Sequence, residues 1–207
     1  MLRILPNRSD QRGGSIIEFV MVVTLLWIPL FMGTLVTSFS LIMAVQVTQV
    51  CRDAGHMYSY GIDFSQPSYQ TLLVNLAPIL KMTPNGGNGV VILSTITYIG
   101  PTDCTNAGYQ ATQSSCTNIN QTVFTQRIVV GNAALHASAF GTPNPTEMDS
   151  SGVISRAGRF TDAANRANFS SVIPLISGQF AYVSEMWANP PFFSSTPTTI
   201  LSARSIF

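Results

Sequence analysis

The dominant feature of the hydropathy pattern is an uncharged run from Phe19 to Val50. As a continuous helix this run would be about 48 Å long, whereas about 20 apolar residues span the roughly 30 Å hydrocarbon core of a bilayer. Residues 19–32 are almost entirely apolar, while residues 34–49 include Thr, Ser and Gln, so the last third is expected to leave the membrane. The pattern therefore predicts one membrane-spanning helix. Pro29 lies inside it and either kinks the helix or is simply tolerated there.

The charges that flank this run predict its orientation. Residues 1–14 contain Arg3, Arg8 and Arg12 against Asp10, and the positive-inside rule keeps such a segment in the cytoplasm. The C-terminal portion is then expected on the outer side of the membrane. A cleaved secretory signal is disfavoured because its apolar region would span about 7–15 residues and end in a small-residue site.

Beyond the helix, residues 54–207 show the patterns of a small α+β domain. Pro67 to Leu80 has apolar residues at helical spacing, with proline suited to the first turn. Three runs rich in β-branched or aromatic residues predict strands, namely residues 90–99, 123–130 and 180–187. The predicted fold class is α+β: a long N-terminal transmembrane helix, followed by a small exported domain with a β-meander and one packed helix.

Composition narrows the class of protein further. Of the 207 residues only 9% are charged and 46% are hydrophobic, with a formal net charge of +1. Soluble domains usually have about 25% charged residues. A disordered segment needs low hydrophobicity and high net charge, and a nucleic-acid-binding protein needs a basic face, so neither class fits. Length allows one domain with an appendage.

The three cysteines have different expected roles. Cys104 and Cys116 close a short loop between two predicted strands, in a compartment that the topology makes oxidising, so we predict a disulfide between them. Such a ring contributes about 3 kcal/mol by the chain-entropy argument. A metal pair is disfavoured because no histidine is near and the spacing is not that of a zinc site. Cys51 is left over, either as a buried small hydrophobic residue or as an intermolecular partner.

A carboxylate stands at the start of the apolar run. The segment reads Gln11-Arg12-Gly13-Gly14-Ser15-Ile16-Ile17-Glu18-Phe19. A carboxylate inside the hydrocarbon costs about 2.5–3.5 kcal/mol at the helix centre and less near the interface. Glu18 either lies in the headgroup zone, where the positive end of the helix favours it, or has a cationic partner.

The short basic leader, the glycines Gly13 and Gly14, and Glu18-Phe19 at the start of a long apolar helix together resemble a type IV prepilin junction. More closely, they resemble the TadE-like pseudopilins of tight-adherence (Tad) pili, a type IVb pilus system. In that family a membrane aspartyl prepilin peptidase cuts after the glycine, and Glu is fifth in the mature chain. A cut between Gly13 and Gly14 makes Glu18 fifth, whereas a cut after Gly14 makes it fourth. The resemblance divides the chain into a leader (1–13), a transmembrane and assembly helix (14–53) and an exported α+β domain (54–207).

The resemblance continues past the membrane. Arg52-Asp53-Ala54 stands where family members often have Arg-Glu-Ala, and Phe180 to Trp187, with Glu185, is similar to the family's late strand with a Val-Glu pair. The resemblance also implies a role for Glu18 in assembly. In a helix bundle its carboxylate would pair with the new α-amine of a neighbouring subunit, setting the axial register.

The function that the resemblance implies is structural, not enzymatic. It is that of a membrane-anchored minor pilin, processed by the peptidase, that helps to assemble a Tad-type pilus for adhesion and surface colonisation. The implied partners are the prepilin peptidase, other pilins and pseudopilins, the Tad secretion machinery and the inner membrane, with no nucleic acid, metal or cofactor. The implied location is the bacterial inner membrane, with a single pass, a cytoplasmic N-terminus and a periplasmic or extracellular C-terminal domain.

Two other classes stay open. A single-pass signal-anchored enzyme or binding module of the cell envelope would keep its cytoplasmic arginines, and a secreted adhesin with a cleaved signal would lose the apolar helix. The enzyme is disfavoured because no acids, bases or metal ligands converge in the sequence. His56 and His136 stand apart, and the glycine-rich residues 86–89 lack the Lys-Ser/Thr of a P-loop.

Overall fold

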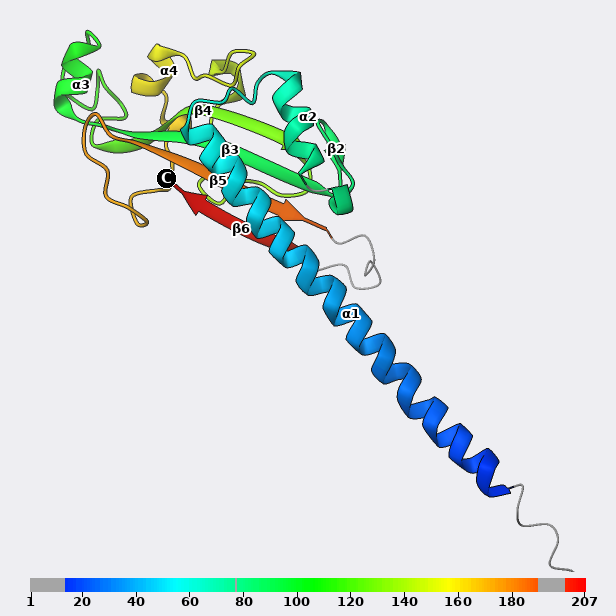
Figure 1. Cartoon of the computed structure of the whole chain (residues 1–207). Helices are drawn as coiled ribbons and strands as arrows, with labels where there is room; N and C mark the ends of the chain where they lie inside the picture. The colour runs from blue at the N-terminus through cyan, green and yellow to red at the C-terminus, as the bar shows by residue number, and fades with distance from the viewer. Residues whose placement is uncertain (1–13, 77, 190–199) are drawn as a thin grey trace, which may run out of the picture. The chain divides into compact units, whose positions relative to one another are not determined.

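We analysed a computed structural model of the chain, which describes residues 14–76, 78–189 and 200–207 (Figure 1). Two units are distinguished, one up to Ile42 and one from Met43 onward. The first contains the N-terminal part of helix α1. The second contains the rest of α1 and all of the sheet, and its fold is α+β with a pilin-like layout.

Helix α1 runs from Gly14 to Ser59, which confirms the predicted long N-terminal helix. Its end is fixed by Gly61, whose φ of 87° is a left-handed conformation that glycine adopts without strain. The Gly61 amide donates to the Tyr58 carbonyl and the Ile62 amide to the Met57 carbonyl, each at 3.0 Å. This Schellman pattern satisfies carbonyls that the last turn would otherwise leave free.

The main sheet is antiparallel and has the strand order β4-β3-β5-β6. The three predicted strands are confirmed, each slightly longer than expected, and the edge strand β6 was not predicted. Strand β5 pairs with β3 rather than with β4, so the chain crosses the sheet between β4 and β5. The strands are β3 (Gly89–Ile99), β4 (Gln121–Gly131), β5 (Phe180–Ala188) and β6 (Leu201–Ile206).

Short elements surround this sheet. The helix predicted over 67–80 is confirmed only to Asn75, because Pro78 lacks the amide hydrogen of an α-helix and its ring clashes with the preceding turn. The remaining elements are α2 (Pro67–Asn75), η1 (Pro78–Leu80), β1 (Met82–Thr83), β2 (Gly86–Gly87), α3 (Pro101–Asn106), η2 (Pro145–Glu147), α4 (Arg156–Thr161) and η3 (Ala163–Asn165).

Both faces of the sheet are covered, which explains why β3 is buried at every position from Gly89 to Ile96. On one face, the last turns of α1 cross the strands (Figure 1) and contribute Val47, Cys51 and Tyr58 to a core that also holds Val91 and Leu93 of β3. On the other face, the long connection between β4 and β5 covers the sheet. It packs buried side chains of its own, Phe140, Ile154 and Phe169, against Ile96, Phe124 and Val183.

Candidate functional site

The N-terminal part of α1 exposes apolar side chains in every direction. Before Met43, none of the described residues is buried, and Leu25 is 82% exposed. The exposed apolar stretch from Ile16 to Ile42 is about 40 Å long, enough to cross a bilayer core. A helix that is apolar all round is stable in hydrocarbon or inside a bundle of helices. This part of the chain is therefore suited to be a signal anchor or membrane anchor.

The hydroxyl groups in this stretch are satisfied within the helix. Each donates to a backbone carbonyl three or four residues earlier, at 2.7–3.0 Å. An unpaired polar group in lipid costs several kcal/mol, and this internal bonding removes that cost. The side chains concerned are Thr24, Thr34, Thr37, Ser38 and Ser40.

Pro29 does not interrupt α1. Its missing amide hydrogen deprives the Leu25 carbonyl, one turn earlier, of its helical donor. Membrane helices tolerate this because neighbouring groups can satisfy the freed carbonyl.

At the predicted cleavage junction, the structure places Gly14, Glu18 and Phe19 together in the first turns of α1, and Gly13 lies outside the described residues. A side chain built on Gly14 would meet no described atom within 4 Å. Glu18 is exposed and forms no hydrogen bond or ion pair with any described residue, and Phe19 is 69% exposed. Gly14 and Glu18 are four positions apart, so they share one helix face. Within the described residues, the junction thus presents an unpaired carboxylate beside a bare apolar surface.

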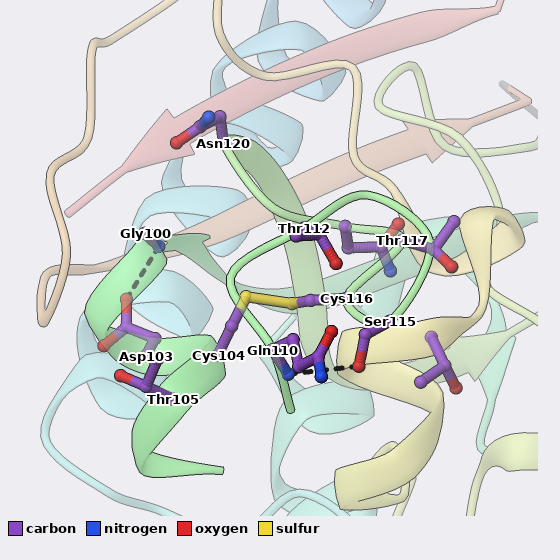
Figure 2. Close-up of a disulfide and its surroundings, with 12 residues drawn as sticks. Gly100, Asp103, Cys104, Thr105, Gln110, Thr112, Ser115, Cys116, Thr117 and Asn120 are labelled. Carbon is purple, nitrogen blue, oxygen red and sulfur yellow. Dashed lines mark hydrogen bonds between the residues drawn. A yellow bond between two sulfur atoms is a disulfide. The ribbon is translucent and has the colours of Figure 1, made fainter. Parts of the chain in front are cut away.

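The predicted disulfide is formed. Figure 2 shows Cys104 of α3 bonded to Cys116, which lies in the loop before β4. The bond closes a small buried cluster with Ile99, Ile119 and Val123. At the start of α3, the Asp103 carboxylate accepts a hydrogen bond of 2.8 Å from the Gly100 amide, which holds the helix against the end of β3. Because disulfides persist in oxidising compartments, this unit is suited to an extracytoplasmic location.

Cys51 is fully buried between α1 and β5. Its thiol donates to the Ser184 carbonyl at 3.3 Å. This contact matches the first of the two interpretations, a small hydrophobic residue of the core.

The opposite face of the sheet holds a buried polar network that the sequence did not predict. Glu185 of β5 is fully buried, and its carboxylate accepts hydrogen bonds from the Ser138 hydroxyl and from the Ala139 amide at 3.1 Å. Arg204 of β6 pairs with it at 3.4 Å. Arg127 of β4 donates to the Gly141 carbonyl at 3.0 Å and, at 3.4 Å, to Ser138.

Arg127 and Glu185 are both buried, and their charges interact electrostatically. Burial lowers the pKa of Arg127 to about 10, and the nearby Glu185 carboxylate counteracts part of that shift. Hydrogen bonds tie residues 138–141 directly to β4 and β5, and Glu185 extends the network to Arg204 of β6. We interpret this network as a structural clamp.

Each of the two histidines packs against an aromatic ring. The His136 ring stacks on Trp187, with ring centroids 4.5 Å apart, and His56 lies against Phe207 at the same separation. Across the part of the chain that the structure describes, no group of three or more His, Cys, Asp or Glu side chains is placed to hold a metal ion.

Comparisons of the chain with protein-family models, with curated proteins and with solved structures find no match. The class of protein is therefore defined by the structure itself. It is an α+β chain in which a long apolar N-terminal helix packs its C-terminal part on a four-stranded antiparallel sheet, next to a disulfide-closed loop.

Proposed function

We propose that the protein is a TadE-like minor pilin: a membrane-anchored pseudopilin, cut by a prepilin peptidase, that helps to assemble a Tad-type pilus. The observation that carries the proposal is the first half of α1. It combines a bare apolar surface with a carboxylate, that of Glu18, which pairs with no described residue and lies one turn from Gly14. The pilin-like layout of the second unit supports it.

The arrangement has a physical rationale. In the bilayer, the arginines of residues 1–13 keep the leader in the cytoplasm. Cleavage after Gly13 would remove them and create an α-amine at Gly14. In a bundle of apolar helices the Glu18 carboxylate would be costly unless paired, and a neighbouring subunit's amine is a cation at the right depth. The exported unit would then present its surface for adhesion.

Processing is the direct test. The full chain, extracted from membranes, is compared by intact mass and N-terminal sequencing after co-expression with active or catalytically dead prepilin peptidase. We expect a product beginning at Gly14 only with the active enzyme. A Gly13→Val variant should stay uncut, while a Thr24→Val variant, changed deeper in the same helix, should be cut normally. An uncut chain in the presence of active peptidase would refute the proposal and leave a single-pass anchored binding module.

Assembly is tested separately with Glu18→Gln. This variant keeps the shape of the side chain and loses the charge. We expect normal processing but loss of co-purification with partner pilins. Retained co-purification would refute the role of Glu18 in register.

A further inference from the structure

Two hollows of the sheet unit meet at α4. One, of about 170 Å³, is lined by Ile99, Phe160 and the loop before β5. The other, of about 260 Å³, has Thr95, Gln126 and Tyr182 on its lining. Arg159 and Phe180 line both hollows. These volumes are below the usual range of about 300–1,000 Å³ for drug-sized ligands, so only a small group fits.

Arg159 has a cationic group that pairs with no residue that the structure describes. Its Nε atom is buried, and among the described residues the guanidinium forms no hydrogen bond or ion pair. The other arginines near it are engaged, since Arg166 donates to Asn118 and Thr117 at 2.9 and 2.7 Å, and Arg156 donates to Asn106 at 3.1 Å. A buried polar atom without a partner costs free energy, more so when the group is charged.

The carboxylates around Arg159 are committed elsewhere. Asp103, which lines the first hollow, accepts from Gly100 and from the Ser177 hydroxyl at 2.6 Å. Arg159 also lines a third hollow together with Glu147 and Asp149, and there Glu147 accepts a hydrogen bond from Ser155. Asp149 accepts from the amides of residues 151 and 153. None of these carboxylates lies within ion-pair distance of Arg159.

Hydrogen bonds fix the position of the Arg159 backbone. Its amide donates to Ser155 at 3.1 Å and its carbonyl accepts from the Asn118 side chain at 2.9 Å. The next residue, Phe160, accepts from the Asn118 amide at 3.1 Å, close to the disulfide at Cys116. These contacts fix the backbone of Arg159 beside both hollows, while no described residue bonds to the guanidinium itself.

The chemistry of the lining defines the ligand. A guanidinium presents a planar fork that matches a carboxylate. Phe180 is 54% exposed and, with Phe160 and Ile99, supplies an apolar surface beside the cation. We propose that Arg159 and Phe180 form a binding site for a small carboxylate that carries an apolar or aromatic group. The site is independent of the proposed pilus function.

The test uses the full chain in detergent micelles and titrates 3-phenylpropionate by calorimetry and by NMR of the arginine Nε–H signals. Two other probes separate the contributions: 3-phenylpropionamide has the ring without the charge, and inorganic phosphate has the charge without the ring. We expect binding of the acid at least tenfold tighter than that of either probe. If the wild-type chain bound the amide or phosphate as tightly as the acid, this result alone would overturn the proposal.

Variants locate the site. Arg159→Gln should weaken binding of 3-phenylpropionate at least tenfold, and Phe180→Ala about threefold to tenfold. Arg52→Gln, which removes the same charge from an exposed position on α1, is the matched control and should bind like the wild type. Unchanged binding by Arg159→Gln would refute the assignment.

The stability of the ligand-free chain distinguishes a binding role of Arg159 from a structural one. Because the guanidinium has no described partner, Arg159→Gln should leave the Tm of the ligand-free chain unchanged or raise it. A marked fall in Tm, together with rescue by Arg159→Lys without ligand, would show that the side chain serves the fold and would overturn the proposal.

Discussion

Replacing Glu185 with Gln tests the clamp on the face of the sheet opposite α1. The substitution keeps the size of the side chain and removes its charge. Glu185 is fully buried, accepts from Ser138 and from the Ala139 amide, and pairs with Arg204. Without the charge, Arg127 loses the carboxylate that offsets part of its desolvation.

The expected magnitude follows from these contacts. Arg127 is joined to Glu185 through the Ser138 hydroxyl and not by a direct ion pair, so the cost of breaking a directly paired buried ion pair, about 3–5 kcal/mol, is an upper bound. Gln can still accept from the Ala139 amide, which lowers the expected loss to about 2–4 kcal/mol. The Arg204 side chain is 42% exposed, and its ion pair contributes about 0.2–1 kcal/mol. Its guanidinium also lies 4.6 Å from the Phe140 ring centroid, so Arg204→Ala should cost about 1–2 kcal/mol in all.

Urea unfolding of the full chain in detergent, followed by tryptophan fluorescence, measures these losses. The chain has two tryptophans, so a Trp27→Phe background leaves Trp187 of β5 as the only reporter. Trp187 neighbours Glu185 on the same face of that strand, because side chains alternate along a strand.

The double variant Arg127→Met/Glu185→Leu supplies the decisive comparison. Replacing both buried charges with apolar side chains removes the uncompensated charge, so we expect it to be more stable than Glu185→Gln alone. A loss below about 1 kcal/mol for Glu185→Gln, or a double variant as unstable as the sum of its parts, would refute the reasoning.

Three further predictions concern the same unit. Replacing Cys104 and Cys116 with Ser should lower the free energy of unfolding by about 3 kcal/mol, and a wild-type chain reduced with dithiothreitol should match the variant in urea unfolding. Gly55→Leu should cost about 1–3 kcal/mol by overpacking, because a Cβ at Gly55 would already lie 3.0 Å from the Cβ of Ser184, and normal stability in thermal unfolding would contradict this close packing. Hydrogen bonds from the Asn144 side chain and then from the Ala164 amide lower the pKa of Asp162. Its contribution to stability is therefore present above the ordinary pKa near 3.8 and is lost as the pH falls through the lowered pKa. In an acid titration, the stability of Asp162→Asn should depend less on pH than that of the wild type.

Local signals predicted much of this fold. A run rich in β-branched residues identified β3, because a strand covered on both faces is mostly apolar and does not alternate with exposed polar residues. Strand β6 has the sequence Leu-Ser-Ala-Arg-Ser-Ile and lies at the sheet edge, where partial exposure lets polar residues alternate with small apolar ones. Its pattern is too weak to separate from a loop. Its place beside β5 depends on pairing, not on propensity.

Such local sequence patterns could not predict contacts between segments that are distant in the sequence. The spacing of Cys104 and Cys116 was enough for the disulfide because both belong to the short connection between β3 and β4. Glu185 was noticed only through a resemblance, and its partners Ser138 and Arg127 come from other segments of the chain. The same limit applies to Arg159, because only the folded structure shows that its guanidinium pairs with none of the described carboxylates.

Helix α1 is one continuous element whose two parts are suited to different environments. From Met43 onward its buried residues fall on one stripe, with Val47, Val50, Ala54 and Tyr58 facing the sheet. Before Met43 no such stripe exists, because the helix is apolar on all sides. Such a surface is unstable in water and is compatible with two surroundings, a lipid bilayer or a bundle of similar helices.

Glu18 distinguishes these two surroundings. Near the membrane interface its carboxylate can stay hydrated, whereas in the interior of a bundle it requires a cation. On the proposed function, cleavage at Gly13 supplies that cation and removes the arginines that hold the helix in the membrane. One bond broken beside Gly14 would then change which of the two surroundings is more stable for the same apolar helix.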